Sequence, residues 1–454
     1  MNRTNTLRRL SLALPFLLLL SPLHPVQAQD NSGKRVRTGW SLGALPDVAY
    51  ETDLGFKYGA IVNLFNYGDG SIYPNYYHTI YAEAARTTTN YNLFRLNYDS
   101  KYLIPNHRLN VDLTYTTDQL FDFYGFNGFE AVIHPEWTDP NDAAYISRAF
   151  YKLHGNMFRF AADLQGNIYG NVFWNAGLGI LDYRISSVDT ERLNRRKDDD
   201  ERLPDTALLY DRYVSHGLIS QAEKDGGFHP YLHAGISYDS RDRLQNPPHG
   251  IYADAFLSWF GAFGKLKDYN HLTANITWRQ YFSLVPDRLT LAYRLGSQLS
   301  LAGRTPFYLN TYLNQLFLQR VTYEGLGGGN SVRGLLRHRI NADGFAFANV
   351  ELRLRLFDFH LGKENFYVGL TPFMDAGMVL QEHALDGSLY DDTDPLWQQN
   401  FDLLADLHSL HLAAGIGLKV AMNENFVLSV DWAHAIDPQD AFGNSLYIKV
   451  GYLF

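Results

Sequence analysis

Apolar and polar residues alternate over ten or more positions in several parts of this chain, and this pattern constrains its fold more than any other feature. In 289–301 the odd positions are apolar except for Ser297, and in 344–357 the even positions are apolar or small. The stretch 408–422 behaves in the same way. Successive side chains of a strand point to opposite faces, and strands of soluble proteins usually span only ~5–6 residues. Longer alternating segments are typical of tilted strands that face lipid on one side and water on the other.

The pattern predicts an all-β fold: a single transmembrane antiparallel β-barrel of 16 strands, with the long loop 303–343 folded into the lumen. After residue 28, no segment has the ~20 consecutive apolar residues that a transmembrane helix needs. The predicted strands span 36–46, 54–66, 75–87, 90–103, 107–117, 146–166, 170–185, 229–238, 251–261, 270–285, 288–302, 344–357, 365–380, 408–422, 426–436 and 445–454.

The connections between these strands alternate in length, which supports the count. Tight turns are predicted at Gly166-Asn167, Pro286-Asp287 and 423–425, and long loops at 118–145, 186–228, 303–343 and 381–407. Short turns on one rim and long loops on the other are typical of an even-stranded barrel with both termini in the periplasm.

The two ends of the chain predict where it is located. Residues 1–28 have a basic start, an apolar run at 10–20 and the small-residue site Val26-Gln27-Ala28, which is the pattern of a cleavable signal peptide. The barrel domain would then span 29–454. At the other end, a predicted strand continues to Phe454, and this aromatic ending resembles that of bacterial outer-membrane barrels. We therefore expect the protein in the outer membrane of a diderm bacterium.

A glycine-rich segment with one arginine is the main candidate for a functional site. Gly327-Gly328-Gly329 and Val332-Arg333-Gly334 follow each other in the predicted lumen loop. Glycines let a backbone pack closely against a wall, and an arginine that leaves bulk water needs carboxylate partners. Glu351 and Asp375 lie at lumen-facing positions on the next two predicted strands. The sequence therefore predicts a lumen-loop anchor made of Arg333, Gly334, Glu351 and Asp375.

Four motifs follow one another in the second half of the chain. The first is a turn that contains Asp239, Arg241, Asp242, Pro248 and Gly250. The loop motif around the arginine and the two acidic strand motifs come next. In this order they make 235–454 resemble the BamA/TamA family of outer-membrane barrels, also called the bacterial surface antigen family. The resemblance implies that the loop arginine binds the two strand motifs inside the lumen.

Two features differ from that family. Leu335 stands where relatives have an aromatic residue after Arg-Gly, and we expect this change to weaken stacking in the lumen. Residues 29–35 leave no room for the periplasmic POTRA modules that inserting or secreting members carry. The resemblance therefore implies a POTRA-less barrel.

The resemblance also implies a function, namely assistance in the assembly or insertion of other outer-membrane proteins through a weak seam between the first and last strands. Here the seam would involve Gly39, Gly43, Gly451 and Phe454, and glycine weakens strand pairing. The implied partners are outer-membrane lipid and lipopolysaccharide, nascent outer-membrane proteins and periplasmic accessory subunits. The alternative is a passive channel or a structural barrel that kept the family fold.

The residues give little support to other chemistries. The net charge is −9, and it becomes −12 once the three arginines of residues 1–28 are lost, which argues against nucleic-acid binding. No Gly-Lys-Ser/Thr follows Gly327 to Gly329, so a phosphate-binding loop is not expected. His408 and His411 are three positions apart on a predicted strand and would face opposite sides. They could not share a metal, and a chain with no cysteine has no thiolate metal site. His, Ser and Asp residues occur in the loops, but no spacing singles out a catalytic set, so we expect no enzyme activity, no cofactor and no metal site.

Overall fold

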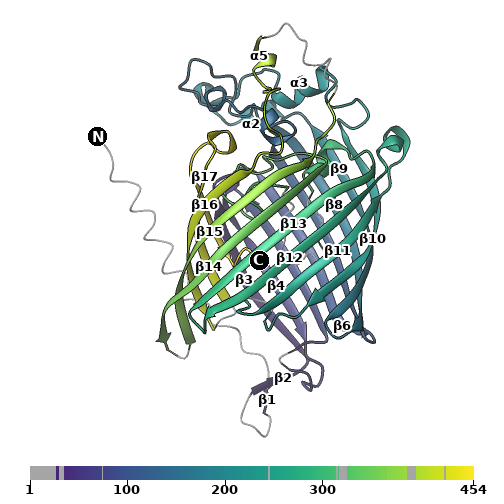
Figure 1. Cartoon of the computed structure of the whole chain (residues 1–454), viewed down its shortest axis with the longest axis vertical. Coiled ribbons are helices and arrows are strands. Elements are labelled where there is room, and N and C mark those ends of the chain that lie inside the picture. The colour runs from purple at the N-terminus through teal and green to yellow at the C-terminus, as the bar shows by residue number, and fades with distance from the viewer. Residues whose placement is uncertain are drawn as a thin grey trace.

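The computed structural model describes residues 27–29, 35–73, 75–243, 246–312, 315, 325–362, 364–385, 395–423 and 426–454. Within these residues, 16 antiparallel strands form a closed barrel (Figure 1). Each strand pairs with its neighbours along the chain, and β18 closes the barrel against β3. The predicted fold class and strand number are confirmed.

The barrel strands are β3 (Trp40–Glu51), β4 (Gly55–Asn66), β5 (His78–Thr87), β6 (Tyr91–Ile104), β7 (His107–Asp122), β8 (Lys152–Tyr169), β9 (Val172–Ser186), β10 (Gly226–Asp239), β11 (Gly250–Phe260), β12 (His271–Val285), β13 (Leu289–Gly303), β14 (Gly344–Leu361), β15 (Glu364–Gln381), β16 (His411–Met422), β17 (Phe426–Ala435) and β18 (Ser445–Val450). Before the barrel, β1 (Gln27–Gln29) pairs with β2 (Arg35–Arg37). The described helices are α2 (Thr190–Asn194), α3 (Leu209–Ser215), α4 (Phe307–Asn310) and α5 (Pro395–Gln398), with short 3-10 turns at Gly128–Glu130, Pro135–Trp137, Asp199–Glu201, Gly264–Tyr269 and Pro438–Asp440.

The alternation in the sequence becomes an apolar outer face and a polar inner face. On β14, Val350 and Leu352 are 42% and 40% exposed on the outside, whereas Glu351 and Arg353 are buried inside. Side chains that face outward from a membrane barrel meet lipid. Among the described residues, no helix has the length and apolar character needed to cross a membrane.

The two rims of the barrel differ. The long loops that carry α2, α3 and α5 lie together beyond one end, at the top of Figure 1. The opposite end has mostly short turns, such as the one between β8 and β9. We call these ends the long-loop rim and the short-turn rim.

Two local predictions were wrong. The turn after β8 is at Gly170-Asn171, where Gly170 has a positive φ of 54°, and not at Gly166-Asn167. Gly166 lies inside β8, where a Cβ would come within 2.3 Å of Nε1 of Trp174, so this glycine makes room for a ring. His408 precedes β16, which begins at His411, so the two histidines do not share a strand.

An aromatic cluster fills the barrel near the long-loop rim. Its buried rings come from four different long loops and include Phe123, Phe150, Tyr213, Phe307 and Trp397. They pack together with buried apolar side chains of β8 and β9. The long loops are therefore held by one another and by the wall, and this packing fixes where the loop between β13 and β14 enters the lumen.

The outer face of β14 provides a test of the lipid-facing surface. Val350→Arg should lower the free energy of unfolding by ~2–4 kcal/mol, because a charged side chain near the bilayer midplane loses its hydration. Chemical denaturation of the protein folded into lipid vesicles measures this loss, with Val350→Leu as an apolar control. Equal stability of the two variants would show that this face does not meet hydrocarbon.

Candidate functional site

The loop between β13 and β14 spans residues 304–343, and we call it the lumen loop; the structure describes 304–312, 315 and 325–343 of it. Its segment 325–343 lies inside the barrel and packs against the wall. Its side chains Val332, Leu335 and Ile340 are completely buried in one apolar cluster. Gly377 on β15 makes room for them, because a Cβ there would lie 2.9 Å from Cδ1 of Ile340. Leu335, expected to weaken stacking, thus contributes to apolar packing instead.

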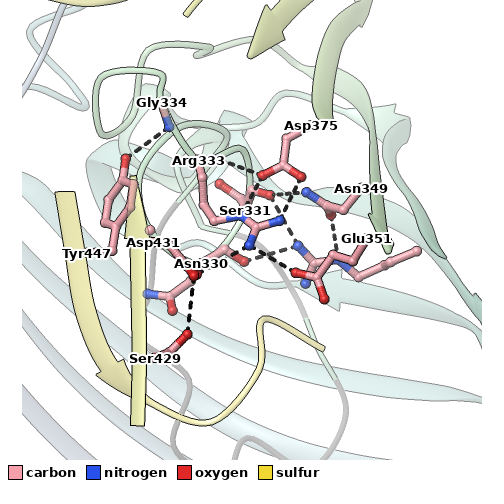
Figure 2. Close-up of polar contacts among 12 residues, drawn as sticks. Asn330, Ser331, Arg333, Gly334, Asn349, Glu351, Asp375, Ser429, Asp431 and Tyr447 are labelled. Atoms are coloured by element: carbon pink, nitrogen blue, oxygen red, sulfur yellow. Dashed lines mark hydrogen bonds and ion pairs between the residues drawn. The ribbon is translucent and has the colours of Figure 1, made fainter. Parts of the chain in front are cut away.

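Arg333 is bound directly by three carboxylates (Figure 2). Its Nε and Nη2 donate to the two oxygens of Asp375 at 2.8 and 3.0 Å, and its backbone N–H donates to Asp375 at 3.0 Å. Nη1 lies 2.9 Å from Oε1 of Glu351, an ion pair without the alignment of a hydrogen bond. Asp431 on β17 lies 3.3 Å from the same Nη1. The structure brings Arg333, Glu351 and Asp375 together, and it adds Asp431.

Ion pairs connect Arg333 with further buried charges, and Arg294 is an additional buried cation beside the same carboxylates. Among the described side chains, three cations and three carboxylates take part, namely Arg333, Arg353, Lys419, Glu351, Asp375 and Asp431. Burial by itself would lower the pKa of Arg333, but Asp375 and Glu351 raise this pKa above its ordinary value, so the guanidinium stays charged. Its Cζ also lies 3.5 Å from the centre of the Phe373 ring, a cation–π contact.

Two glycines bring the lumen loop against the junction of the first and last strands. The N–H of Gly334, a residue with a φ of 98°, donates to Oη of Tyr447 at 3.0 Å. A Cβ on Gly329 would lie 2.8 Å from Cδ1 of Tyr447 and 3.1 Å from Oε2 of Glu51. Tyr447 and Glu51 are paired across β18 and β3. Side chains larger than hydrogen at these positions would push the loop away from that junction.

Several residues that hold the lumen loop were missed in the sequence. Asp431 occupies an odd position of β17, and the odd positions of that strand are the buried ones. The strand alternation therefore contained the signal for it. Arg294 on β13 donates to Oδ1 of Asn349 at 2.8 Å and to the carbonyls of Asn330 and Ser331 at 3.1 and 3.2 Å.

Two further arginines tie the lumen loop to the N-terminal half of the barrel. Nη1 of Arg337 donates to Asp118 on β7 at 2.9 Å. Arg339 donates to the carbonyls of Gly128 and Ala131 at 2.8 and 3.1 Å. No motif or spacing in the sequence indicated these contacts, because Asp118, Gly128 and Ala131 lie 219, 211 and 208 residues away from the arginines that they bind.

The predicted turn motif builds the connection between β10 and β11 at the short-turn rim. Arg241 donates from Nε and Nη2 to the carboxylate of Asp239 at 2.9 and 2.8 Å, and its Cζ lies 4.7 Å from the Tyr252 ring centre. Gly250 has a φ of 107°, and a Cβ there would lie 2.5 Å from the carbonyl oxygen of Ser240. The remaining motif residues in this turn are Asp242 and Pro248.

The predicted seam residues do not pair with one another. Within the described chain, β18 and β3 pair through Tyr447 with Glu51 and Ile448 with Tyr50 only. The first barrel strand is 40–51 and not 36–46, so Gly39 precedes it, and Gly43 pairs with β4. The seam closes only near the long-loop rim: its pairing stops at Ile448, although β18 continues to Val450, and β18 never reaches the start of β3.

The last strand ends at Val450 and does not continue to the last residue, contrary to the prediction. Gly451 has a φ of 99° and turns residues 451–454 into the barrel, where the C-terminal label lies in Figure 1. Nη2 of Arg353 donates to the carbonyl of Phe454 at 2.8 Å. The guanidinium also lies 4.3 Å from the ring centre of Tyr452 and 5.1 Å from that of Phe454. These contacts hold the tail away from the seam.

Replacing the two main partners of the lumen network should give a non-additive result. Arg333→Ala leaves buried carboxylates without their cation and should lower the free energy of unfolding by ~3–5 kcal/mol. Asp375→Asn disrupts the same bidentate contact with Arg333. The double variant should therefore lose less free energy of unfolding than the sum of the losses of the two single variants. Chemical denaturation measures all three, with Arg184→Ala on the exposed outer face as a control. Additive losses would show that the two residues are not coupled.

Comparison with known proteins agrees with this geometry. The Omp85 superfamily domain matches residues 69–451. The barrel is similar to BamA from Haemophilus ducreyi lacking POTRA domains 1-3, with a TM-score of 0.54 and 16% identity over 97% of this chain and 78% of that one. It is also similar to CdiB from Escherichia coli, with a TM-score of 0.54 and 12% identity over 96% of this chain and 68% of that one.

At these identities the two structures show the fold alone. Among curated proteins, no sequence matches the chain. The domain match, however, covers most of the sequence and carries the motifs that bind the lumen loop. The resemblance found in the sequence is thereby confirmed, and this outer-membrane barrel belongs to the Omp85 superfamily.

Proposed function

We propose that the protein assists the assembly or insertion of other outer-membrane proteins, and that their strands are received at the seam between β3 and β18. One observation carries this proposal. Within the described residues, β3 forms twelve residue pairs with β4 but two with β18. The next smallest junction of the described wall, between β17 and β18, has six pairs, so the seam is the weakest junction among the described strands.

The direction of the backbone groups identifies the edge that β3 leaves open. The N–H of Gly39 donates to the carbonyl of Gly68, and its carbonyl accepts from the N–H of Tyr67, so odd-numbered residues bond toward β4. The N–H of Thr52 donates to the carbonyl of Leu446 at 3.2 Å, so even-numbered residues bond toward the seam. The two observations agree, because successive residues of a strand bond to opposite sides.

Pro46 lies at an even-numbered position of β3 and has no N–H to donate. The seam edge therefore lacks one donor in the middle of the strand. Proline is tolerated in sheets at edge strands for this reason. The sequence of β3 is suited to pairing fully with β4 and weakly with β18.

An open strand edge is costly in a bilayer. Unpaired backbone groups in hydrocarbon cost several kcal/mol each, and lipid-exposed edges are avoided. The described part of β3 from Trp40 to Val48 has no partner on its seam side. An incoming strand of another protein would satisfy these groups by strand addition. This need for a partner favours an assembly function over a passive channel or a purely structural barrel.

The proposal includes a location and a topology. We propose that residues 1–28 are a signal peptide; residues 1–26 lie outside the described part of the chain. The short-turn rim and both termini would be periplasmic, and the long-loop rim would face outward into the lipopolysaccharide layer. Periplasmic accessory subunits would then reach the protein at the short-turn rim, and no nucleic acid is involved.

A disulfide across the seam tests the proposal. Tyr50 and Ile448 are paired and face outward, and a hydrogen-bonded antiparallel pair has the Cα spacing that a disulfide needs. The chain has no cysteine, so Tyr50→Cys with Ile448→Cys gives a single possible bond. Oxidation should abolish the delivery of outer-membrane proteins in cells that depend on this chain, and a reductant should restore it.

The matched control locks a neighbouring junction and keeps one of the two substitutions. Val430 pairs with Ile448 between β17 and β18, so Val430→Cys with Ile448→Cys forms a disulfide that leaves the seam free. This variant should retain activity when oxidised. Full activity of the oxidised seam-locked protein would contradict a lateral opening. The channel would be favoured if the locked protein kept its conductance and if depletion of the protein from cells reduced the uptake of small solutes.

A further inference from the structure

A second open edge lies at the short-turn rim, on the hairpin of β14 and β15. The pairing of β13 with β14 stops at Leu289 and Leu354. The last bond between these neighbours runs from the N–H of Arg355 to the carbonyl of Arg288 at 2.8 Å. β14 continues to Leu361, so its last six residues have β15 on one side and, in the described chain, no strand on the other.

This projecting part of β14, residues 356–361, is exposed on both faces. Each of its six residues is exposed, including Phe357 at 53% and Leu361 at 58%. Phe357 pairs with Val368 and Phe359 with Phe366, which places both rings on the outer face of the sheet. The rings of Phe359 and Phe366 stack with centroids 5.2 Å apart. The outer side of the hairpin is therefore an apolar stripe.

The free backbone groups belong to Asp358 and His360. Leu361 and Glu364 close the hairpin as a pair, so the odd-numbered residues of this segment bond toward β15. Before this segment, the backbone of the odd-numbered Arg355 bonds toward the β13 side. The bulge between Arg355 and Phe357 shifts the register by one residue, so that in 357–361 the even-numbered residues face that side. The N–H and carbonyl groups of Asp358 and His360 therefore face the open side, and Leu356 is the unpaired residue at the bulge.

Neither proline nor lysine occurs in 356–361 to block this edge. Natural proteins usually protect an exposed edge with such residues, because an unpaired edge accepts other strands. The segment therefore has the properties of a docking edge, apart from the bulge at its base.

A pocket lined by arginines lies where this edge begins, beside Leu354 and Arg355. The cavity has a volume of about 70 Å³. Its charged lining residues are Arg243, Arg288, Arg353, Arg355 and Asp287. The carboxylate of Asp358 reaches Arg355 and lies 3.3 Å from Nη1 of Arg288, so the arginines at the edge already bind one carboxylate. Guanidinium groups bind carboxylates through paired, charge-assisted hydrogen bonds.

We propose that the edge 356–361 and this arginine pocket together dock an extended, acidic segment of a periplasmic partner protein. The open edge would add the segment as a strand, its apolar side chains would lie along Phe357 and Phe359, and an acidic side chain would enter the pocket. The inference rests on the orientation in the proposed function, which places the short-turn rim in the periplasm. It deepens that function by naming where an accessory subunit binds and which chemistry it offers.

Binding of a short labelled peptide to the full mature chain in lipid nanodiscs tests the inference. The probe is a fluorescein-labelled peptide in which valine alternates with glutamate, and its matched form has glutamine in place of glutamate. Fluorescence anisotropy should show the glutamate peptide binding about tenfold more tightly, since one charge-assisted bond corresponds to about a tenfold change in affinity. Absence of binding, or equal affinity of the two peptides, would overturn the inference.

Two pairs of variants separate the edge from the pocket. His360→Pro removes an edge N–H and should weaken binding about tenfold, whereas His360→Ala keeps that N–H and should bind normally. Arg288→Gln should weaken the glutamate peptide about tenfold, whereas Arg184→Gln near the other rim should have no effect. Normal binding by both His360→Pro and Arg288→Gln would overturn the inference even if the peptide binds.

The seam provides the final control, because β3 is also an open edge. Ala44→Pro removes an N–H from the seam side of β3, as His360→Pro does at the hairpin, and should leave peptide binding unchanged. Weaker peptide binding by Ala44→Pro than by His360→Pro would place the peptide at the seam and overturn the docking site at the hairpin. Peptide binding together with retained assembly activity of the oxidised protein that carries Tyr50→Cys and Ile448→Cys would leave the docking site intact and reject the seam.

Discussion

Because Arg333 keeps its charge inside the barrel, three strands must present carboxylates to a single point. Asp375 supplies the bidentate contact, and Glu351 and Asp431 surround the remaining nitrogen. Breaking such a buried pair leaves an uncompensated charge and costs several kcal/mol. The position of the lumen loop therefore depends on this interaction, and the apolar cluster of Val332 and its neighbours follows from it.

The same loop connects the lumen to the seam. Gly334 donates to Tyr447, and Lys449 reaches the carbonyl of Gly329, so the loop holds β18 from the inside. Tyr447 is one of the two residues of β18 that still pair with β3. The seam is thus closed where the lumen loop supports it, and it lacks pairing beyond Ile448. The anchor in the lumen and the closure of the wall are parts of one arrangement.

Sequence reasoning predicted what depends on local periodicity and missed what depends on distant partners. Alternation has a period of two whatever surrounds a strand, so the 16 strands and the inward direction of Glu351 were recognisable. The end of β18 was not, because it depends on the φ of Gly451 and on how Arg353 binds the tail. Asp431 was recoverable from strand parity, whereas the contacts of Arg337 required the fold.

The two open edges found among the described strands lie toward the short-turn rim. β3 has no partner strand on its seam side from Trp40 to Val48, and β14 runs past the end of β13 at the same rim. At the long-loop rim, by contrast, the aromatic cluster and the lumen loop fill the barrel and tie neighbouring parts of the wall together. Backbone groups that lack a partner are costly inside a membrane and available in water. The described barrel is thus filled and held together at the long-loop rim and leaves strand edges unpaired toward the short-turn rim. In the orientation proposed above, proteins that arrive from the periplasm would meet these edges.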